Sequence, residues 1–153
     1  PELYGKITVR HLNPPHEVAI APPGSADMAL TFRNVHNWIM AGQENEYFAT
    51  FYTALKPGGI LGVVEHRAKP GAGMEVMRTS GYVTEAYVIE LAAAAGFELL
   101  EKSEINANAK DSTLHPEGVW TLPPEYRLKD TDRAKYSAIG ESDRMTLKFV
   151  KPL

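Results

Sequence analysis

The stretch from Ala26 to Arg67 decides the fold. It begins with Ala26-Asp-Met-Ala-Leu-Thr-Phe-Arg-Asn-Val-His-Asn-Trp38 and ends with Leu55-Lys-Pro-Gly-Gly-Ile-Leu-Gly-Val-Val-Glu-His-Arg67. Met28–Phe32 and Ile60–Glu65 are apolar nearly throughout, as expected of strands that are covered on both faces. A helical pattern separates them, which predicts one βαβ unit of a parallel sheet. Its polar residues follow the carboxyl ends of the strands, where open α/β sheets bind ligands.

Two helices are predicted from periodicity and from residues that begin or end helices. The first runs from about Gln43 to Leu55, because four apolar side chains fall on one face: Tyr47, Phe48, Phe51 and Leu55. Pro57-Gly58-Gly59 then stops the helix and turns the chain. The second helix has Thr84 as its N-cap, runs to about Ala95 and ends at Gly96.

Three further segments are predicted to be strands, namely Lys6–Arg10, Phe97–Ile105 and Met145–Val150. Phe97–Ile105 has the mixed polarity of a strand at a sheet edge, and Met145–Val150 alternates in polarity and closes the chain. Lys69–Gly81 is predicted to be a mobile loop. Asn106–Gly140 is predicted to be a long irregular excursion with one short helix near residues 131–137. A loop of that length in a compact domain is usually functional or a cover.

Composition excludes several classes of protein. The 153 residues suit one domain, with 44% hydrophobic and 23% charged residues, and the formal net charge is −3. No basic stripe indicates nucleic acid as a partner, and no apolar run approaches the roughly 20 residues of a membrane helix. The absence of cysteine removes disulfides, thiolate catalysis and Cys-ligated zinc. The opening Pro-Glu-Leu-Tyr-Gly does not resemble a signal peptide, so a cytoplasmic location is the default expectation.

Polar side chains gather after both strands of the βαβ unit. Arg33, Asn34 and His36 follow the first strand, where Arg33 could pair with a carboxylate and His36 could act as a general base. The alternative is a capped strand end whose neighbouring apolar residues belong to the core. Glu65-His66-Arg67 ends the second strand and faces the same crevice, with Glu65 and His66 pointing to opposite sides. For this group the alternative is an ion-pair network that ties down the loop 69–81.

Other polar residues carry weaker signals. Asn106, Asn108, Asp111 and His115 follow a third strand, and Asp143-Arg144 is typical of a structural pair at a turn. His36, Glu65, His66 and Asp111 together have ligand types that suit Zn, Mn or Fe. Because no His-x-x-x-His or similar spacing supports coordination, we predict no metal site.

Several segments of the chain resemble class I S-adenosylmethionine (SAM)-dependent methyltransferases. The resemblance is closest to the ubiquinone and menaquinone biosynthesis branch, where a similar Arg-Asn-Val follows the fourth strand, and to a bacterial group of predicted methyltransferases. It implies a partial Rossmann-like α/β sheet, mostly parallel with an antiparallel last strand, and methyl transfer from SAM to a small-molecule acceptor. The segments that carry it span essentially the whole chain: residues 32–38, 55–59, 81–83, 103–108 and 140–144.

The resemblance also assigns roles to residues at the strand ends. The catalytic residues are expected to be His36, Glu65 and His66. The expected cofactor-binding residues are Phe32, Arg33 and Asn34, and the expected acceptor-binding residues are Asn37, Arg67, Asn106 and Arg144.

One departure from the family pattern concerns the cofactor. The family's first half carries a Gly-rich loop that cradles the methionine part of SAM and an acidic residue that binds the ribose, and neither occurs in this sequence. The chain is therefore expected to be the C-terminal portion of such an enzyme, to bind SAM poorly alone, and to pair with the missing N-terminal half or self-associate. Self-association would use the strand Lys6–Arg10 and the bare edge of Met28–Phe32. The alternative function is a non-catalytic binding module that retains part of the fold.

Overall fold

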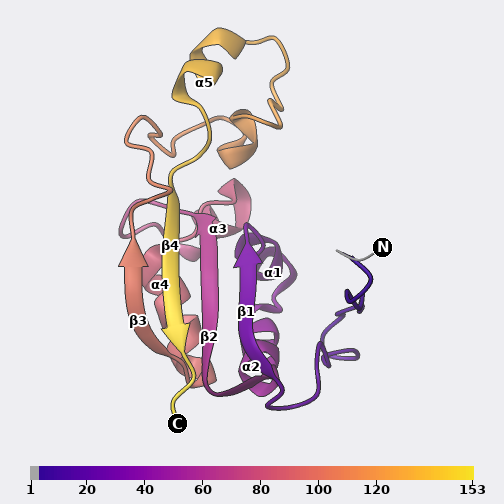
Figure 1. Cartoon of the computed structure of the whole chain (residues 1–153). Helices are drawn as coiled ribbons and strands as arrows, with labels where there is room; N and C mark the ends of the chain where they lie inside the picture. The colour runs from indigo at the N-terminus through magenta and orange to yellow at the C-terminus, as the bar shows by residue number, and fades with distance from the viewer. Residues whose placement is uncertain (1–3) are drawn as a thin grey trace.

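The computed structural model describes residues 4–153, and its centre is a four-stranded sheet in the order β1-β2-β4-β3 (Figure 1). β1 (Ala26–Phe32) pairs in parallel with β2 (Leu55–His66). β4 (Arg144–Val150) lies antiparallel to β2 and to β3 (Glu98–Ser103), so β4 alone runs against the other strands. This confirms the prediction of an α/β sheet with an antiparallel last strand, and it confirms that the strand predicted at Phe97–Ile105 lies at an edge.

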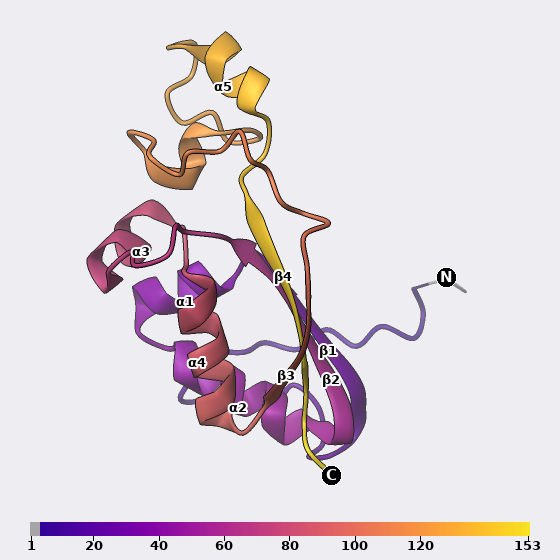
Figure 2. The same cartoon turned by 90° about the vertical axis from the view of Figure 1, so that its left-hand side faces the viewer.

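Four helices lie on one side of this sheet (Figure 2). They are α1 (Val35–Ala41), α2 (Glu44–Ala54), α3 (Met74–Ser80) and α4 (Glu85–Ala95). The core lies between the two layers, and its fully buried side chains include Ile39, Phe48, Leu61, Leu147 and Phe149. Among residues 4–153, no helix is long and apolar enough to cross a bilayer.

The two predicted helices are confirmed close to their expected bounds. On α2, the side chains of Phe48 and Phe51 are buried, as their spacing predicted. Thr84 caps α4 by accepting a hydrogen bond from the backbone N–H of Tyr87 at 3.3 Å, a contact that typically stabilises a helix by about 1 kcal/mol. Gly96 ends α4 with φ 106°, a conformation that favours glycine.

The opposite face of the sheet carries no helix among the described residues (Figure 2). Met28, Leu30 and Phe32 alternate along β1 and are each 56% exposed on this face. Thr31, between two of them, points to the helices and is buried. β1 is also an edge strand, because it pairs only with β2. The sheet therefore has one covered face and one open face with an apolar strip.

The prediction of a strand at Lys6–Arg10 is wrong. Residues 7–12 have no regular secondary structure and pair with no strand. Val9 is 84% exposed. A β-branched run becomes a strand only where a neighbouring strand supplies hydrogen bonds, and none of the described strands lies beside this segment.

Two short helices were missed by the sequence analysis. Lys69–Gly81 was predicted to be a loop, but it contains α3, which has a single buried residue, Met77. α1 occupies the segment after β1 and is separated from α2 by Gly42 in the left-handed conformation. Helices of seven residues are too short to show a clear apolar period. In addition, α2 ends at Ala54, before the predicted Pro57-Gly58-Gly59 stop, which instead lies in the irregular start of β2.

Residues 104–143 form a cap above the ends of the strands (Figure 1). The cap holds a short 3-10 helix, η1 (Gly118–Thr121), and α5 (Arg133–Ile139), which overlaps the predicted helix near residues 131–137. The chain leaves and re-enters the sheet at adjacent points, because the backbone N–H of Arg144 donates to Asn106 O at 3.1 Å. The cap therefore covers the edge of the sheet where the polar residues gather.

Candidate active site

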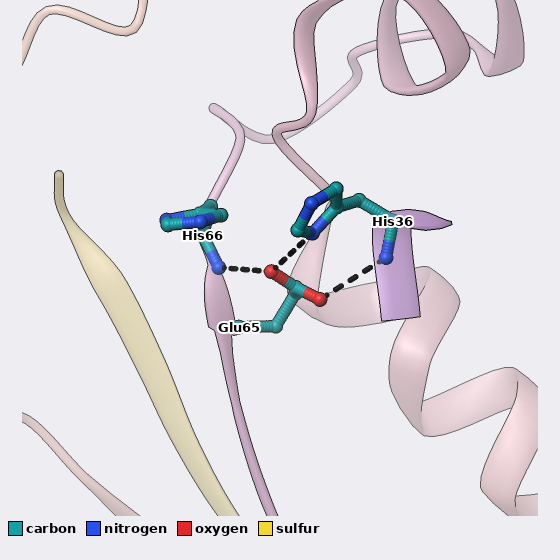
Figure 3. Close-up of side chains that lie close together, drawn as sticks. All are labelled: His36, Glu65 and His66. Carbon is teal, nitrogen blue, oxygen red and sulfur yellow. Dashed lines mark hydrogen bonds and ion pairs between the residues drawn. The ribbon is translucent and has the colours of Figure 1, made fainter. Parts of the chain in front are cut away.

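Glu65 organises the residues at the carboxyl ends of β1 and β2 (Figure 3). Its carboxylate is completely buried at the end of β2. Oε1 accepts hydrogen bonds from His36 Nδ1 at 2.9 Å and from the backbone N–H of His66 at 2.8 Å, and Oε2 accepts from the backbone N–H of His36 at 3.1 Å. A buried carboxylate needs such donors, and here they tie the first turn of α1 to the end of β2.

His36 reaches Glu65 because the chain turns sharply after β1. Arg33 adopts a left-handed conformation, with φ 57°, and its backbone N–H donates to Val64 O at 2.7 Å. α1 then starts at Val35, which places His36 in its first turn. Because an ionised carboxylate only accepts hydrogen bonds, Nδ1 of His36 carries the proton and Nε2 keeps a free lone pair. A histidine oriented in this way is suited to act as a general base.

His66 lies beside His36, with ring centroids 5.2 Å apart. Its Nδ1 is hydrogen-bonded to Ser142 Oγ at 2.5 Å. Burial is the main cause that lowers the pKa of the His66 imidazole to about 3, with the neighbouring His36 and the positive charges of Arg144 and Arg33 adding to it. His66 is therefore a neutral imidazole at pH 7, able to donate or accept a hydrogen bond but not to carry charge.

A cavity of about 310 Å³ opens above the two histidines. Its floor comes from the strand ends, and its roof comes from the cap. The polar lining residues are Arg33, Asn34, His36, His66, Glu125 and Arg144, and the apolar ones are Phe32, Val119, Trp120, Leu122, Pro123 and Pro124. A second hollow of about 350 Å³ shares Phe32, Arg33 and Arg144 with the first and adds Val64, Asn106 and Glu141. The two guanidinium groups thus border both spaces.

Most of the site residues predicted from the sequence come together here. Phe32, Arg33, Asn34, His36, His66 and Arg144 line the cavity, and Glu65 lies behind the histidines. Asn106 borders the second hollow, where its Nδ2 donates to Thr146 Oγ1 at 2.7 Å. Asn37 is exposed on α1 and lines neither space.

Arg67 lies apart from the cavity in an ion-pair network. Its guanidinium donates to both oxygens of Glu104, at 2.9 and 2.7 Å, and to both oxygens of Asp143, at 3.0 Å each. These bonds raise the pKa of Arg67. Burial opposes ionisation of Asp143, but the bonds from Arg67 and from Asn108 N–H outweigh it and hold the Asp143 pKa below its usual value. The network joins the end of β2 to the start and end of the cap.

A second buried histidine–carboxylate pair lies inside the cap. His115 Nε2 donates to Asp111 Oδ1 at 2.8 Å, and the Asp111 side chain is fully buried. The same carboxylate also accepts from Tyr82 Oη, from the backbone N–H of Asp143 and from the backbone N–H of Thr113, each at 2.8 Å. Asp111 and His115 were expected as polar residues after a third strand. They join parts of the cap to one another and to Tyr82, and they lie outside the cavity.

The apolar roof of the cavity was missed by the sequence analysis. Trp120 approaches the His36 ring edge-on, with centroids 6.1 Å apart, and Leu122 is buried beside it. Both belong to Val119-Trp-Thr-Leu-Pro-Pro124, an apolar run inside an otherwise polar excursion. That contrast was the available signal, because an apolar run in a long loop must cover something.

Three of the four residues considered as metal ligands do cluster. Ligand atoms of His36, Glu65 and His66 lie within 4.8 Å of one another, whereas Asp111 belongs to the second pair. An ion bound between His36 Nδ1 and Glu65 would displace the hydrogen bond that joins them. The prediction of no metal site stays a prediction.

Comparison with known proteins identifies the fold. No family model and no curated protein matches the sequence. Among solved structures, the chain is similar to the [4+2]-cyclase SpnF, with 18% identity, a TM-score of 0.57, and coverage of 88% of this chain and 52% of SpnF. It is also similar to 1,6-didemethyltoxoflavin-N1-methyltransferase of Burkholderia thailandensis, solved with 1,6-didemethyltoxoflavin and S-adenosylhomocysteine, with 14% identity, a TM-score of 0.52, and coverage of 89% and 48%. A SAM-dependent methyltransferase of Methanosarcina mazei matches with 12% identity, a TM-score of 0.53, and coverage of 86% and 61%.

These similarities show that the chain has the open, mixed α/β sheet of class I methyltransferases. The chain spans about half the length of the first two of these proteins. Because one of them is a cyclase, the fold alone does not define the reaction.

Proposed function

We propose that this chain is the acceptor-binding and catalytic portion of a SAM-dependent methyltransferase that acts on a small molecule. The observation that carries the proposal is the Glu65–His36 pair, whose imidazole lines a closed-over cavity at the carboxyl ends of the parallel strands. This is the position where open α/β sheets bind ligands, and the sheet is of the class I methyltransferase type.

The cavity residues suit a simple proton-transfer role. SAM, when bound, supplies a methyl group on a sulfonium centre. With SAM bound, His36 Nε2 would be placed to take the proton that an acceptor O–H or N–H loses when the methyl group is transferred. Glu65 holds the imidazole in position and stabilises its protonated form. Neutral His66 and the roof residues orient the acceptor and exclude water, so that positioning contributes much of the rate.

The residues assigned to the cofactor fit only one end of it. Arg33 offers a guanidinium that suits the methionyl carboxylate, Asn34 offers an amide, and Phe32 offers an exposed aromatic face, all on the cavity rim. No described residue forms a Gly-rich loop that could hold the nucleoside end. We therefore propose that a segment outside this chain completes the SAM site. The Arg33-Asn34-Val35 sequence after β1 supports placing the protein near the ubiquinone and menaquinone branch.

The open face of the sheet supports the same proposal. Its apolar strip, Met28, Leu30 and Phe32, lies on an edge strand whose outer hydrogen-bonding groups have no described strand beside them. Such an edge is prone to pair with another polypeptide. The isolated chain is expected to self-associate, and Leu30→Lys is expected to shift it toward monomer in light scattering. A wild-type chain that is monomeric at high concentration would count against this.

Two measurements test the proposed function. Calorimetric titration of the 153-residue chain with SAM should show no micromolar binding, and micromolar binding would refute the shared cofactor site. Methyl transfer should appear when the chain is produced in frame with the coding sequence immediately upstream, measured as release of S-adenosylhomocysteine with a panel of small acceptors. If that longer protein binds SAM but transfers no methyl group to any acceptor, the catalytic assignment fails.

A further inference from the structure

The charges around the cavity are unequal. Among its lining residues, two are arginines, Arg33 and Arg144, and one is a carboxylate, Glu125, which is exposed on the cap. The charges of both arginines reach the floor of the cavity, because both contribute to the lowered pKa of His66. Each guanidinium therefore presents a positive charge to the cavity, with Glu141 paired to Arg144 and the Glu65 carboxylate held behind His36.

The two arginines start from different parts of the sheet. Arg33 follows β1, whereas Arg144 opens β4 and pairs directly with His66 across the sheet. The proposed function uses one guanidinium, Arg33, for the single carboxylate of the methyl donor. Arg144 has no counterpart in the donor, so its charge is available to the acceptor.

Arg144 is already arranged to hold an anion. Its side chain is 15% exposed, and its guanidinium is paired with the Glu141 carboxylate, whose side chain is 59% exposed. Arg144 Nε also lies 3.4 Å from Ser142 Oγ. A largely buried arginine whose partner is an exposed surface carboxylate can exchange that partner for a ligand carboxylate at little cost, because Glu141 is solvated when released.

The apolar residues of the cavity lining indicate the shape of the uncharged part of the ligand, called its body below. Trp120, Leu122 and Pro123 form an apolar wall on the cap side, and the Arg127 guanidinium stacks on the far side of the site's tryptophan, 4.5 Å from its ring centroid. A flat apolar group can lie against this wall while a polar atom faces His36. The volume of about 310 Å³ suits a small molecule of this kind.

We propose that the methyl acceptor is a small anionic molecule with a flat apolar body, whose carboxylate or phosphate is bound by Arg144 and whose body packs against Trp120. The identification of this ligand as the methyl acceptor rests on the proposed function, whereas the anion site itself is defined by the residues of the cavity.

The experiment titrates the chain with benzoate and with benzamide, which have nearly the same shape and differ in charge, and follows backbone amide shifts by NMR. Benzoate should bind at least tenfold more tightly than benzamide. Arg144→Ala should weaken benzoate binding about tenfold or more, a typical cost of losing a charge-assisted hydrogen-bonded pair, and Arg144→Lys should weaken it less. Glu141→Gln should tighten it, because the competing carboxylate is gone. Phenyl phosphate, titrated in parallel, shows whether carboxylate or phosphate is preferred.

Arg78→Ala is the matched control, since Arg78 is an exposed arginine on α3 that lies away from the cavity. It removes the same charge and should leave benzoate binding unchanged. Equal binding of benzoate and benzamide would overturn the proposal, as would unchanged benzoate binding in Arg144→Ala. Loss of binding in Arg33→Ala with retention in Arg144→Ala would place the anion on the donor side and also overturn it. No methyl donor is present, so these results are independent of whether the protein transfers methyl groups.

Discussion

This molecule contains two buried histidine–carboxylate pairs, one at the strand ends and one in the cap. His36 and Glu65 are 2.9 Å apart, and His115 and Asp111 are 2.8 Å apart. By distance and burial the two pairs are nearly the same. They differ in their surroundings, because His36 lines a cavity whereas the His115 side chain, 4% exposed, packs against Tyr82 and Tyr136.

The difference shows that an imidazole–carboxylate bond does not by itself make a catalytic site. In the cap, Asp111 accepts from four donors, two in its own loop and one each at Tyr82 and Asp143, and so joins three segments of the chain. At the strand ends, Glu65 holds a histidine whose other nitrogen is left for a ligand. The same chemistry thus serves stability in one place and is available for proton transfer in the other.

The largest expected effect is a difference in methyl-transfer activity between variants of His36 and of His115. In the longer, SAM-binding protein, His36→Gln should lower methyl transfer by about 10²- to 10⁴-fold, the usual contribution of a general base. The glutamine can still donate to Glu65, so the fold should be retained. The matched change, His115→Gln, should leave transfer within about threefold and lower the free energy of unfolding by about 1 kcal/mol. Equal losses of activity in the two variants would remove the distinction.

The next effect concerns the stability of the cap. Asp111→Ala leaves four hydrogen-bond donors without their acceptor and should lower the free energy of unfolding by about 3 kcal/mol. For a chain of this size the Tm should fall by roughly 6–12 °C, measured by circular dichroism. Asp130→Ala, at an exposed position in the cap, is the control and should change the Tm little. A small effect at Asp111 would mean that the cap is fastened by other contacts.

The smallest effect is a pH dependence at the strand ends. The pKa of His66 is about 3 in the folded chain, whereas an unfolded histidine titrates near about 6.5. Between these values the unfolded chain binds a proton that native His66 does not, so stability falls as pH falls. The loss attributable to His66 is about 2 kcal/mol between pH 7 and pH 5. Urea unfolding should show this loss for the wild type and a smaller loss for His66→Gln; equal losses in both proteins would contradict the assignment.

Much of the fold could be predicted from the sequence because its central unit has strong periodicity. β1, α2, β2 and the Thr84 and Gly96 boundaries of α4 all follow from local patterns. The seven-residue helices α1 and α3 carry too little pattern to be found. The strand expected at Lys6–Arg10 failed because a strand depends on a partner, which local sequence does not reveal.

Some residues of the candidate site could likewise be predicted from local sequence, and others could not. His36, His66 and Arg33 were predicted because residues after neighbouring parallel strands converge at one edge of the sheet. Arg67 was grouped with them as a site residue, and the alternative of an ion-pair network describes it better. Its partners Glu104 and Asp143 lie far along the chain and could not be identified from local sequence. The apolar wall around Trp120 was missed for the same reason, because it reaches the histidines only through tertiary packing.

The way the cap joins the sheet has a consequence for how this protein can diversify. The backbone bond between Arg144 and Asn106 closes the base of the cap, so β3 and β4 keep their register whatever chain lies between residues 106 and 144. The roof over His36 is therefore carried by the cap, whereas His36 lies on α1 and Glu65 on β2. Changes in the length or sequence of this one segment can therefore alter the lining of the cavity while the His36–Glu65 pair stays in place.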